Sequence, residues 1–98
     1  MHPKVKEIVD QLKPYNPEKI ILFGSYASGN PGEYSDVDLI VVKKTDKPFH
    51  ERQIEARMLL EIETPLDIFI FTPEEFEKHK NTNLFLKEAS TKGKVIYG

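Results

Sequence analysis

With 98 residues the chain is long enough for one small core but too short for two domains, so we expect a single domain over residues 1–98 with one substrate site. Its composition, 39% apolar and 31% charged residues, argues against disorder, and no stretch reaches the roughly 20 apolar residues of a membrane span. The absence of cysteine excludes disulfides and thiolate metal sites, and the net charge of −2 argues against direct binding to nucleic acid, so we expect a cytoplasmic protein that binds neither nucleic acid nor membrane.

The first third of the chain predicts a helix, a strand and a short second helix. Residues 3–13 form the first helix, which begins at a proline suited to a first turn and carries apolar residues at helical spacing: Val5, Ile8, Val9 and Leu12. After two further prolines, Lys19–Phe23 is a short apolar run closed by Gly24 and predicts a buried strand. Ser25–Ser28 can then form a short helix that ends at Gly29.

The middle of the chain predicts two strands separated by a helix. Residues 36–42 are rich in β-branched side chains and predict the second strand. Residues 65–71 predict the third. Between them we expect a helix over residues 48–62, with an inner apolar stripe made of Phe49, Ile54, Met58, Leu59 and Ile62.

The last third predicts two more helices and a final strand. Thr72 is an expected N-cap, because Pro73 follows at the first helical position and Glu75 stands three residues after the cap. Asn83 is expected to begin the last helix, and residues 95–97 form a closing strand.

Three acidic residues are the first candidates for chemistry. Because side chains alternate along a strand, Asp36 and Asp38 point to the same face, where two like charges at the start of an apolar strand repel unless a cation or proton lies between them. Magnesium fits such oxygen ligands best. Asp67 interrupts the third strand and reaches the same place if the second and third strands are neighbours. Alternatively, the pair is a solvated strand end or a cap and turn, and Asp67 makes a local hydrogen bond.

The turn after the first strand is a candidate phosphate site. A glycine followed by a serine that opens a helix presents backbone N–H groups and a hydroxyl to an anion, as Gly24 and Ser25 would. The glycine spacing over residues 24–29 is that of a P-loop, but Asn30 and Pro31 stand where that motif requires lysine and a hydroxyl residue, which excludes it. An ordinary strand-to-helix turn is the alternative, and the acids downstream favour phosphate binding over it.

Together, residues 22–29 (LFGSYASG), residues 35–41 (SDVDLIV) and residues 66–68 (LDI) resemble the signature of the DNA polymerase beta nucleotidyltransferase superfamily. The short length resembles the minimal nucleotidyltransferases, which include MntA-type antitoxins paired with HEPN-domain proteins. The similarity covers nearly the whole chain and is strongest over residues 22–42.

The resemblance implies an α/β domain of the α+β type, with a mixed sheet flanked by helices. It also implies that Gly24 and Ser25 hold the triphosphate and that Asp36 and Asp38 bind magnesium. Asp67 would complete a two-metal site as the third catalytic carboxylate and help activate the attacking hydroxyl.

One position departs from the family pattern. Ser28 belongs to the same nucleotide-binding turn, but many relatives carry arginine there. A guanidinium could make charge-assisted contacts to phosphate that serine cannot match, so activity or triphosphate affinity is expected to be reduced. ATP is the usual donor among small relatives, while GTP, CTP and UTP stay open.

The leading functional hypothesis is a magnesium-dependent transfer of a nucleoside monophosphate, AMP from ATP, to a hydroxyl of a HEPN-type partner, as the antitoxin of a toxin–antitoxin pair. Transfer to a small molecule is a second hypothesis, against which the shortness of the chain counts. A third is a binding module that neutralises a HEPN-type partner by complex formation, with its nucleotide site weak or unused. Self-association stays open.

Overall fold

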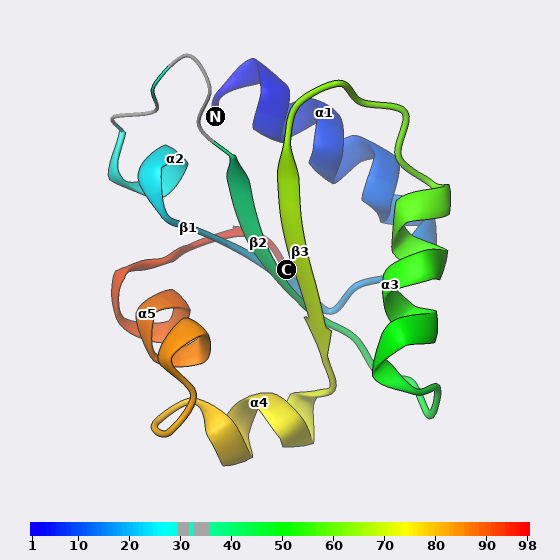
Figure 1. Ribbon diagram of the computed structural model, residues 1–98, viewed down its shortest axis with the longest axis vertical. Helices are drawn as coiled ribbons and strands as arrows, with labels where there is room; N and C mark the ends of the chain where they lie inside the picture. Colours follow the sequence, from blue (N-terminus) through cyan, green and yellow to red (C-terminus); the bar gives the residue numbers. More distant parts are fainter. Residues whose placement is uncertain (30–31, 33–35) are drawn as a thin grey trace.

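Four strands form one sheet, and helices cover both of its faces (Figure 1). A computed structural model describes residues 1–29, 32 and 36–98. The elements in chain order are α1 (Pro3–Leu12), a 3₁₀ turn (Lys13–Tyr15), β1 (Lys19–Phe23), α2 (Ser25–Ser28), β2 (Val37–Val42), α3 (Phe49–Met58), β3 (Leu66–Phe71), α4 (Pro73–His79), α5 (Leu84–Lys92) and β4 (Lys94–Tyr97). The strand order is β3-β2-β1-β4. Strand β1 is antiparallel to β2 and β4, whereas β2 and β3 are parallel, so the expected mixed sheet is confirmed.

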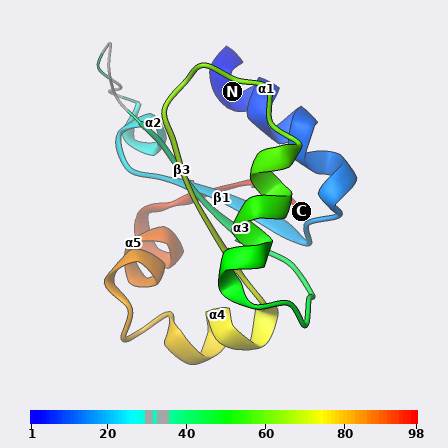
Figure 2. The same ribbon diagram turned by 45° about the vertical axis from the view of Figure 1, so that its right-hand side comes forward.

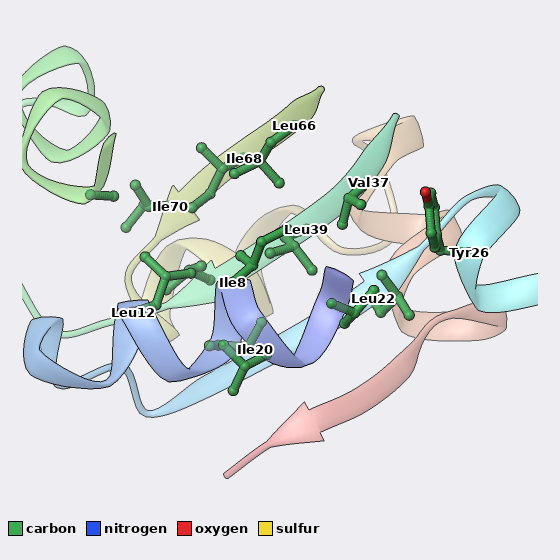
Figure 3. Close-up of a cluster of buried hydrophobic side chains, with 14 of the residues drawn as sticks. Ile8, Leu12, Ile20, Leu22, Tyr26, Val37, Leu39, Leu66, Ile68 and Ile70 are labelled. Carbon is green, nitrogen blue, oxygen red and sulfur yellow. The ribbon is translucent and has the colours of Figure 1, made fainter. Parts of the chain in front are cut away.

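Helices α1 and α3 cover one face of the sheet, which we call the α1 face (Figure 2). Apolar side chains from both helices meet alternate residues of β1, β2 and β3 there (Figure 3). The core of this face includes Val5, Ile8, Leu12, Ile20, Leu22, Val37, Leu39, Ala56, Leu66, Ile68 and Ile70. The apolar stripe expected for the first helix is therefore confirmed.

Helices α4 and α5 pack on the opposite face, which we call the α5 face. The remaining residues of β1, β2 and β3 point to this side, because successive side chains alternate between the two faces along these strands. The smaller core of this face is made of Ile21, Phe23, Ile40, Val42, Phe76, Leu86 and Ala89, with Phe69 and Phe71 packed beside it.

Helix starts follow the capping signals in the sequence. The Thr72 hydroxyl accepts from the Glu75 N–H at 3.1 Å, and the Glu75 carboxylate accepts from the Thr72 N–H at 2.8 Å, which is the predicted capping box. The Asn83 side chain caps α5 as expected. Among the described residues no helix is long and apolar enough to cross a membrane; α1 and α3 have 10 residues each.

The orientation and length of α3 correct the sequence prediction. The helix ends at Met58 instead of Ile62, and Ile54 and Met58 point outward with 57% and 80% of their surface exposed. Its buried residues are Arg52 and Ala56. The predicted inner stripe was wrong at Ile54 and Met58, because polar side chains of α3, described below, bond to the backbone of β3 and therefore face the sheet. Leu59 and Ile62, which follow the end of the helix, do pack against the core.

Candidate functional site

The parallel pairing of β2 and β3 brings two of the predicted acids together. Asp38 and Asp67 are Cα partners in the register, and both belong to the α5 face at the end of the sheet where β2 and β3 begin. This confirms that the second and third strands are neighbours. Asp38 is half-buried, whereas Asp67 is exposed and accessible from outside. Asp36 precedes β2 by one residue and is also exposed.

The surroundings of Asp38 disfavour its charged form. Burial raises the pKa of Asp38 to about 6, and the negative charges of Asp67 and Asp36 act in the same direction. A hydrogen bond between the Asp38 and Asp67 carboxyl groups also raises this pKa. The cluster therefore holds repelling charge that a proton or a cation can neutralise.

Gly24 brings the turn after β1 into contact with the same carboxyl group. Its backbone has φ 74° and ψ −155°, a combination that essentially only glycine adopts. A Cβ atom at this position would lie 2.2 Å from Asp38 Oδ2, so a side chain cannot fit without displacing the carboxylate. Phe23 pairs with Asp38 in the register between β1 and β2, which fixes the glycine beside the acid.

The short helix predicted after this glycine is present as α2. The N–H groups of Ala27 and Ser28 donate to the Gly24 carbonyl at 3.1 and 3.2 Å, and Gly29 ends the helix in a left-handed conformation. Ser25 is the first residue of α2, where backbone N–H groups lack partners within the helix and can attract an anion. The turn and the acids therefore form one continuous site.

The Ser28 hydroxyl bonds within its own helix in this structure. Its side chain is exposed, and its hydroxyl donates to the Ser25 carbonyl at 2.9 Å. This bond closes the helix on itself. Ser35, which belongs to the motif in the sequence, lies outside the described residues.

The donor set suits a hard divalent cation, although the described side chains do not form a finished metal cluster. Within residues 1–29, 32 and 36–98, no group of three histidine, cysteine or acidic side chains is arranged to hold a metal ion. The Asp38–Asp67 pair nevertheless presents carboxylate oxygens, and a positive charge there would relieve the repulsion that raises the pKa of Asp38. Asp36 is the third acid whose charge reaches the pair.

One further acid belongs to these surroundings and was missed in the sequence. The charge of Glu88 on α5 also raises the pKa of Asp38. Glu88 lines a surface hollow of about 280 Å³ along α5. No local pattern marks this residue, because its place beside the acids depends on how α5 packs on the sheet. A larger hollow of about 630 Å³, lined by Lys4, Glu7 and residues 61–65, includes none of the predicted site residues.

Comparisons with known proteins identify the family and the fold of the chain. A family model described as a nucleotidyltransferase domain matches residues 2–89. A protein of Methanocaldococcus jannaschii, described as a putative protein adenylyltransferase, is 32% identical over 96 residues, which are 95% of this chain and 94% of that protein. A crystal structure of a toxin–antitoxin with AMP-PNP has a TM-score of 0.63 at 22% identity, over 95% of this chain and 72% of that one. A mutant of the toxin–antitoxin MntA–HpeT has a TM-score of 0.60 at 24% identity, over 96% and 72%. The two solved structures share the fold.

Proposed function

The chain belongs to the nucleotidyltransferase domain family, and from this premise we propose that it transfers AMP from ATP to a hydroxyl group of a partner protein. The relative described as a protein adenylyltransferase supports this choice of donor and acceptor, because it matches nearly end to end. The observation that carries the proposal is the register of β2 and β3, which places Asp67 beside Asp38, the acid that lies against the Gly24 turn.

Different residues of the chain bind the triphosphate of the donor and its magnesium ion in this proposal. In this proposal the backbone at Gly24 and the start of α2 at Ser25 hold the triphosphate, since the first amides of a helix attract anions. Asp36, Asp38 and Asp67 would hold magnesium beside the phosphates. Magnesium would supply neutralisation of the negative charge on the attacking and leaving oxygens.

The transfer step then uses the most accessible acid of the pair. Asp67 is exposed, so an acceptor hydroxyl can approach it from outside and pass its proton to the carboxylate. A bond forms between the acceptor oxygen and the α-phosphorus, and the bond from that phosphorus to the pyrophosphate oxygen breaks. Pyrophosphate leaves with its electron pair, and AMP stays on the acceptor.

We propose a HEPN-type protein as the acceptor and partner. In this proposal the hydroxyl comes from another chain, and the relative described as a putative protein adenylyltransferase supports a protein as the acceptor. Two solved structures with this fold come from toxin–antitoxins, which supports a toxin as the class of partner. The HEPN identity rests on the family resemblance alone.

Ser28 favours a second candidate function, in which the chain neutralises its partner by binding without transfer. The position lacks the arginine of many relatives, and its hydroxyl is bonded to the helix's own backbone. If this defect is decisive, a tight complex forms and the partner is never modified.

Substitution of Asp67 tests the transferase proposal. Asp67→Asn should reduce AMP transfer by about 100-fold or more, as expected for loss of a general base, while binding of magnesium and ATP changes only a few-fold. Intact-mass spectrometry of a HEPN-type partner measures the transfer, and calorimetry measures the binding. Asp46→Asn, at an exposed acid in the loop before α3, is the matched control and should behave as wild type. A tight complex whose partner never gains mass would leave only the binding function.

A further inference from the structure

Side chains of α3 hold the outer edge of β3. Strand β3 ends the sheet, with β2 on its inner side. On its outer side, three carbonyls in alternate positions accept hydrogen bonds from α3: Leu66 from Arg57 at 3.1 Å, Ile68 from Gln53 at 2.5 Å, and Ile70 from Arg52 at 3.2 Å. The donors and acceptors follow opposite chain directions, so α3 runs antiparallel to the strand it clamps. This ladder takes the place of a further strand on this edge.

Asp67 lies between the first two of these bonds. The Leu66 carbonyl and the Asp67 N–H belong to one planar peptide unit and point in opposite directions across the strand. Arg57 therefore holds this unit from outside, while β2 pairs with it from inside. Any rotation of the unit moves the Asp67 side chain relative to Asp38.

Two of the three donors, Arg52 and Gln53, also have buried atoms in the core. Arg52 is buried and makes an ion pair with Glu75 at 2.7 Å, so replacing it would disturb α4 as well. Gln53 has its amide oxygen buried with no hydrogen-bond partner in the described part of the chain. Arg57 is exposed, and the bond to Leu66 is its contact with the strand. It can be changed without opening the core.

We propose that Arg57 is a positioning residue for Asp67, fixing the peptide unit that carries this acid in register with Asp38. The role of Asp67 in transfer rests on the proposed function, but its placement by Arg57 does not. Arg57 touches no reacting atom in this scheme and acts only through the Leu66 carbonyl.

Two measurements on the full chain test this placement. Arg57→Met keeps most of the side-chain length but has no donor, and Arg57→Lys keeps a charged donor. In Arg57→Met, hydrogen exchange of the Asp67 amide should become about 10-fold faster relative to the Ile21 amide of the central β1 strand. Transfer of AMP to a HEPN-type partner should fall about 10-fold to 100-fold in kcat, with KM for ATP changed less than about twofold. Arg57→Lys should recover part of both losses.

Lys78→Met, at an exposed lysine of α4, removes the same charge elsewhere and should change neither measurement. The inference is overturned if exchange at Asp67 is unchanged in Arg57→Met, if all amides accelerate equally, or if Lys78→Met gives the same loss. If the wild-type chain transfers no AMP, the proposed function fails, and the exchange measurement alone decides the placement.

Discussion

On the α1 face, strands β2 and β3 carry apolar side chains from end to end, whereas on the α5 face the same strands begin with Asp38 and Asp67 and turn apolar only afterwards. The uninterrupted rows are Val37, Leu39 and Val41 on β2 and Leu66, Ile68 and Ile70 on β3. Alternation thus lets two adjacent residues serve different needs: one face supplies hydrophobic stability, and the other carries charges that cost stability.

Substitutions of the neighbours Leu39 and Asp38 should show most clearly that one face stabilises the fold and the other binds the nucleotide. Leu39 is fully buried on the α1 face, so Leu39→Ala should lower the free energy of unfolding by about 2–5 kcal/mol. Asp38→Asn removes a repelled charge and should change stability much less, yet abolish binding of ATP with magnesium. Chemical denaturation and calorimetry at pH 7 provide the two readings. An equal loss of stability in both variants would show that the faces do not differ in this way.

Two glycines test whether the backbone after β1 is in contact with Asp38 on the α5 face. Gly24→Ala should cost about 2–4 kcal/mol, because alanine is strained at this backbone conformation and its Cβ collides with the Asp38 carboxylate. Gly29→Ala is the control: φ is also positive, but no atom of the described residues lies within 4 Å of the added Cβ, so only about 1–2 kcal/mol is expected. The difference between the two, measured by thermal or chemical unfolding, reports the contact with Asp38. An equal loss in the free energy of unfolding in both variants would show that the contact with Asp38 does not contribute.

The charge on the α5 face should also appear as a pH dependence. The pKa of Asp38 is raised from its usual value near 3.8 to about 6, so between these values the folded chain binds more protons than the unfolded chain. This contribution to stability is present at pH 4 and is lost as the pH rises to about 6. After allowance for solvent screening at this half-buried group, the loss should be about 1–2 kcal/mol.

Asp38→Asn isolates this contribution, because the pKa of Glu75 is lowered by Arg52 in both proteins and gives an opposite slope common to them. The stability of wild type relative to the variant should fall between pH 4 and 6, as measured by denaturation at four pH values. Parallel profiles would contradict the assignment.

The smallest effect is expected at Ser28, at the exposed end of α2. Ser28→Arg restores a cation beside the turn and should tighten ATP binding by a few-fold, about 1 kcal/mol or less for an exposed pair. The gain should shrink as salt is added, because exposed charges are screened over about 8 Å at physiological ionic strength. Calorimetry at low and high salt measures it, and an unchanged dissociation constant at low salt would mean that residue 28 points away from the phosphates.

Local signals predicted much of the fold and the candidate site. The strand runs, the capping box at Thr72 and the alternation that sets Asp38 on a polar face follow from neighbouring residues. The meeting of Asp38 with Asp67 needed only the assumption that the strands are adjacent. The structure brings Asp38 and Asp67 together and sets Gly24 beside Asp38, while the chemical roles of the site residues stay predictions.

Tertiary contacts determine the features that local sequence patterns did not predict. Periodicity favoured Ile54 and Met58 as inner residues of α3, but hydrogen bonds from Arg52, Gln53 and Arg57 to the β3 edge turned the helix the other way. The pairing of β4 with β1 joins segments far apart in sequence, and no local pattern specifies it. The same holds for Glu88, whose effect on Asp38 depends on helix packing.

One carboxylate joins three elements that are separate in sequence. Glu75 closes the capping box at the start of α4 and also forms an ion pair with Arg52 of α3, which in turn donates to Ile70 of β3. Fraying of the first turn of α4 therefore weakens the ion pair that holds Arg52 of α3 in place. Conversely, movement of α3 away from the sheet removes the cation that pairs with Glu75. The two helices lie on opposite faces, yet partial opening should release them together and uncover the β3 edge in one cooperative event.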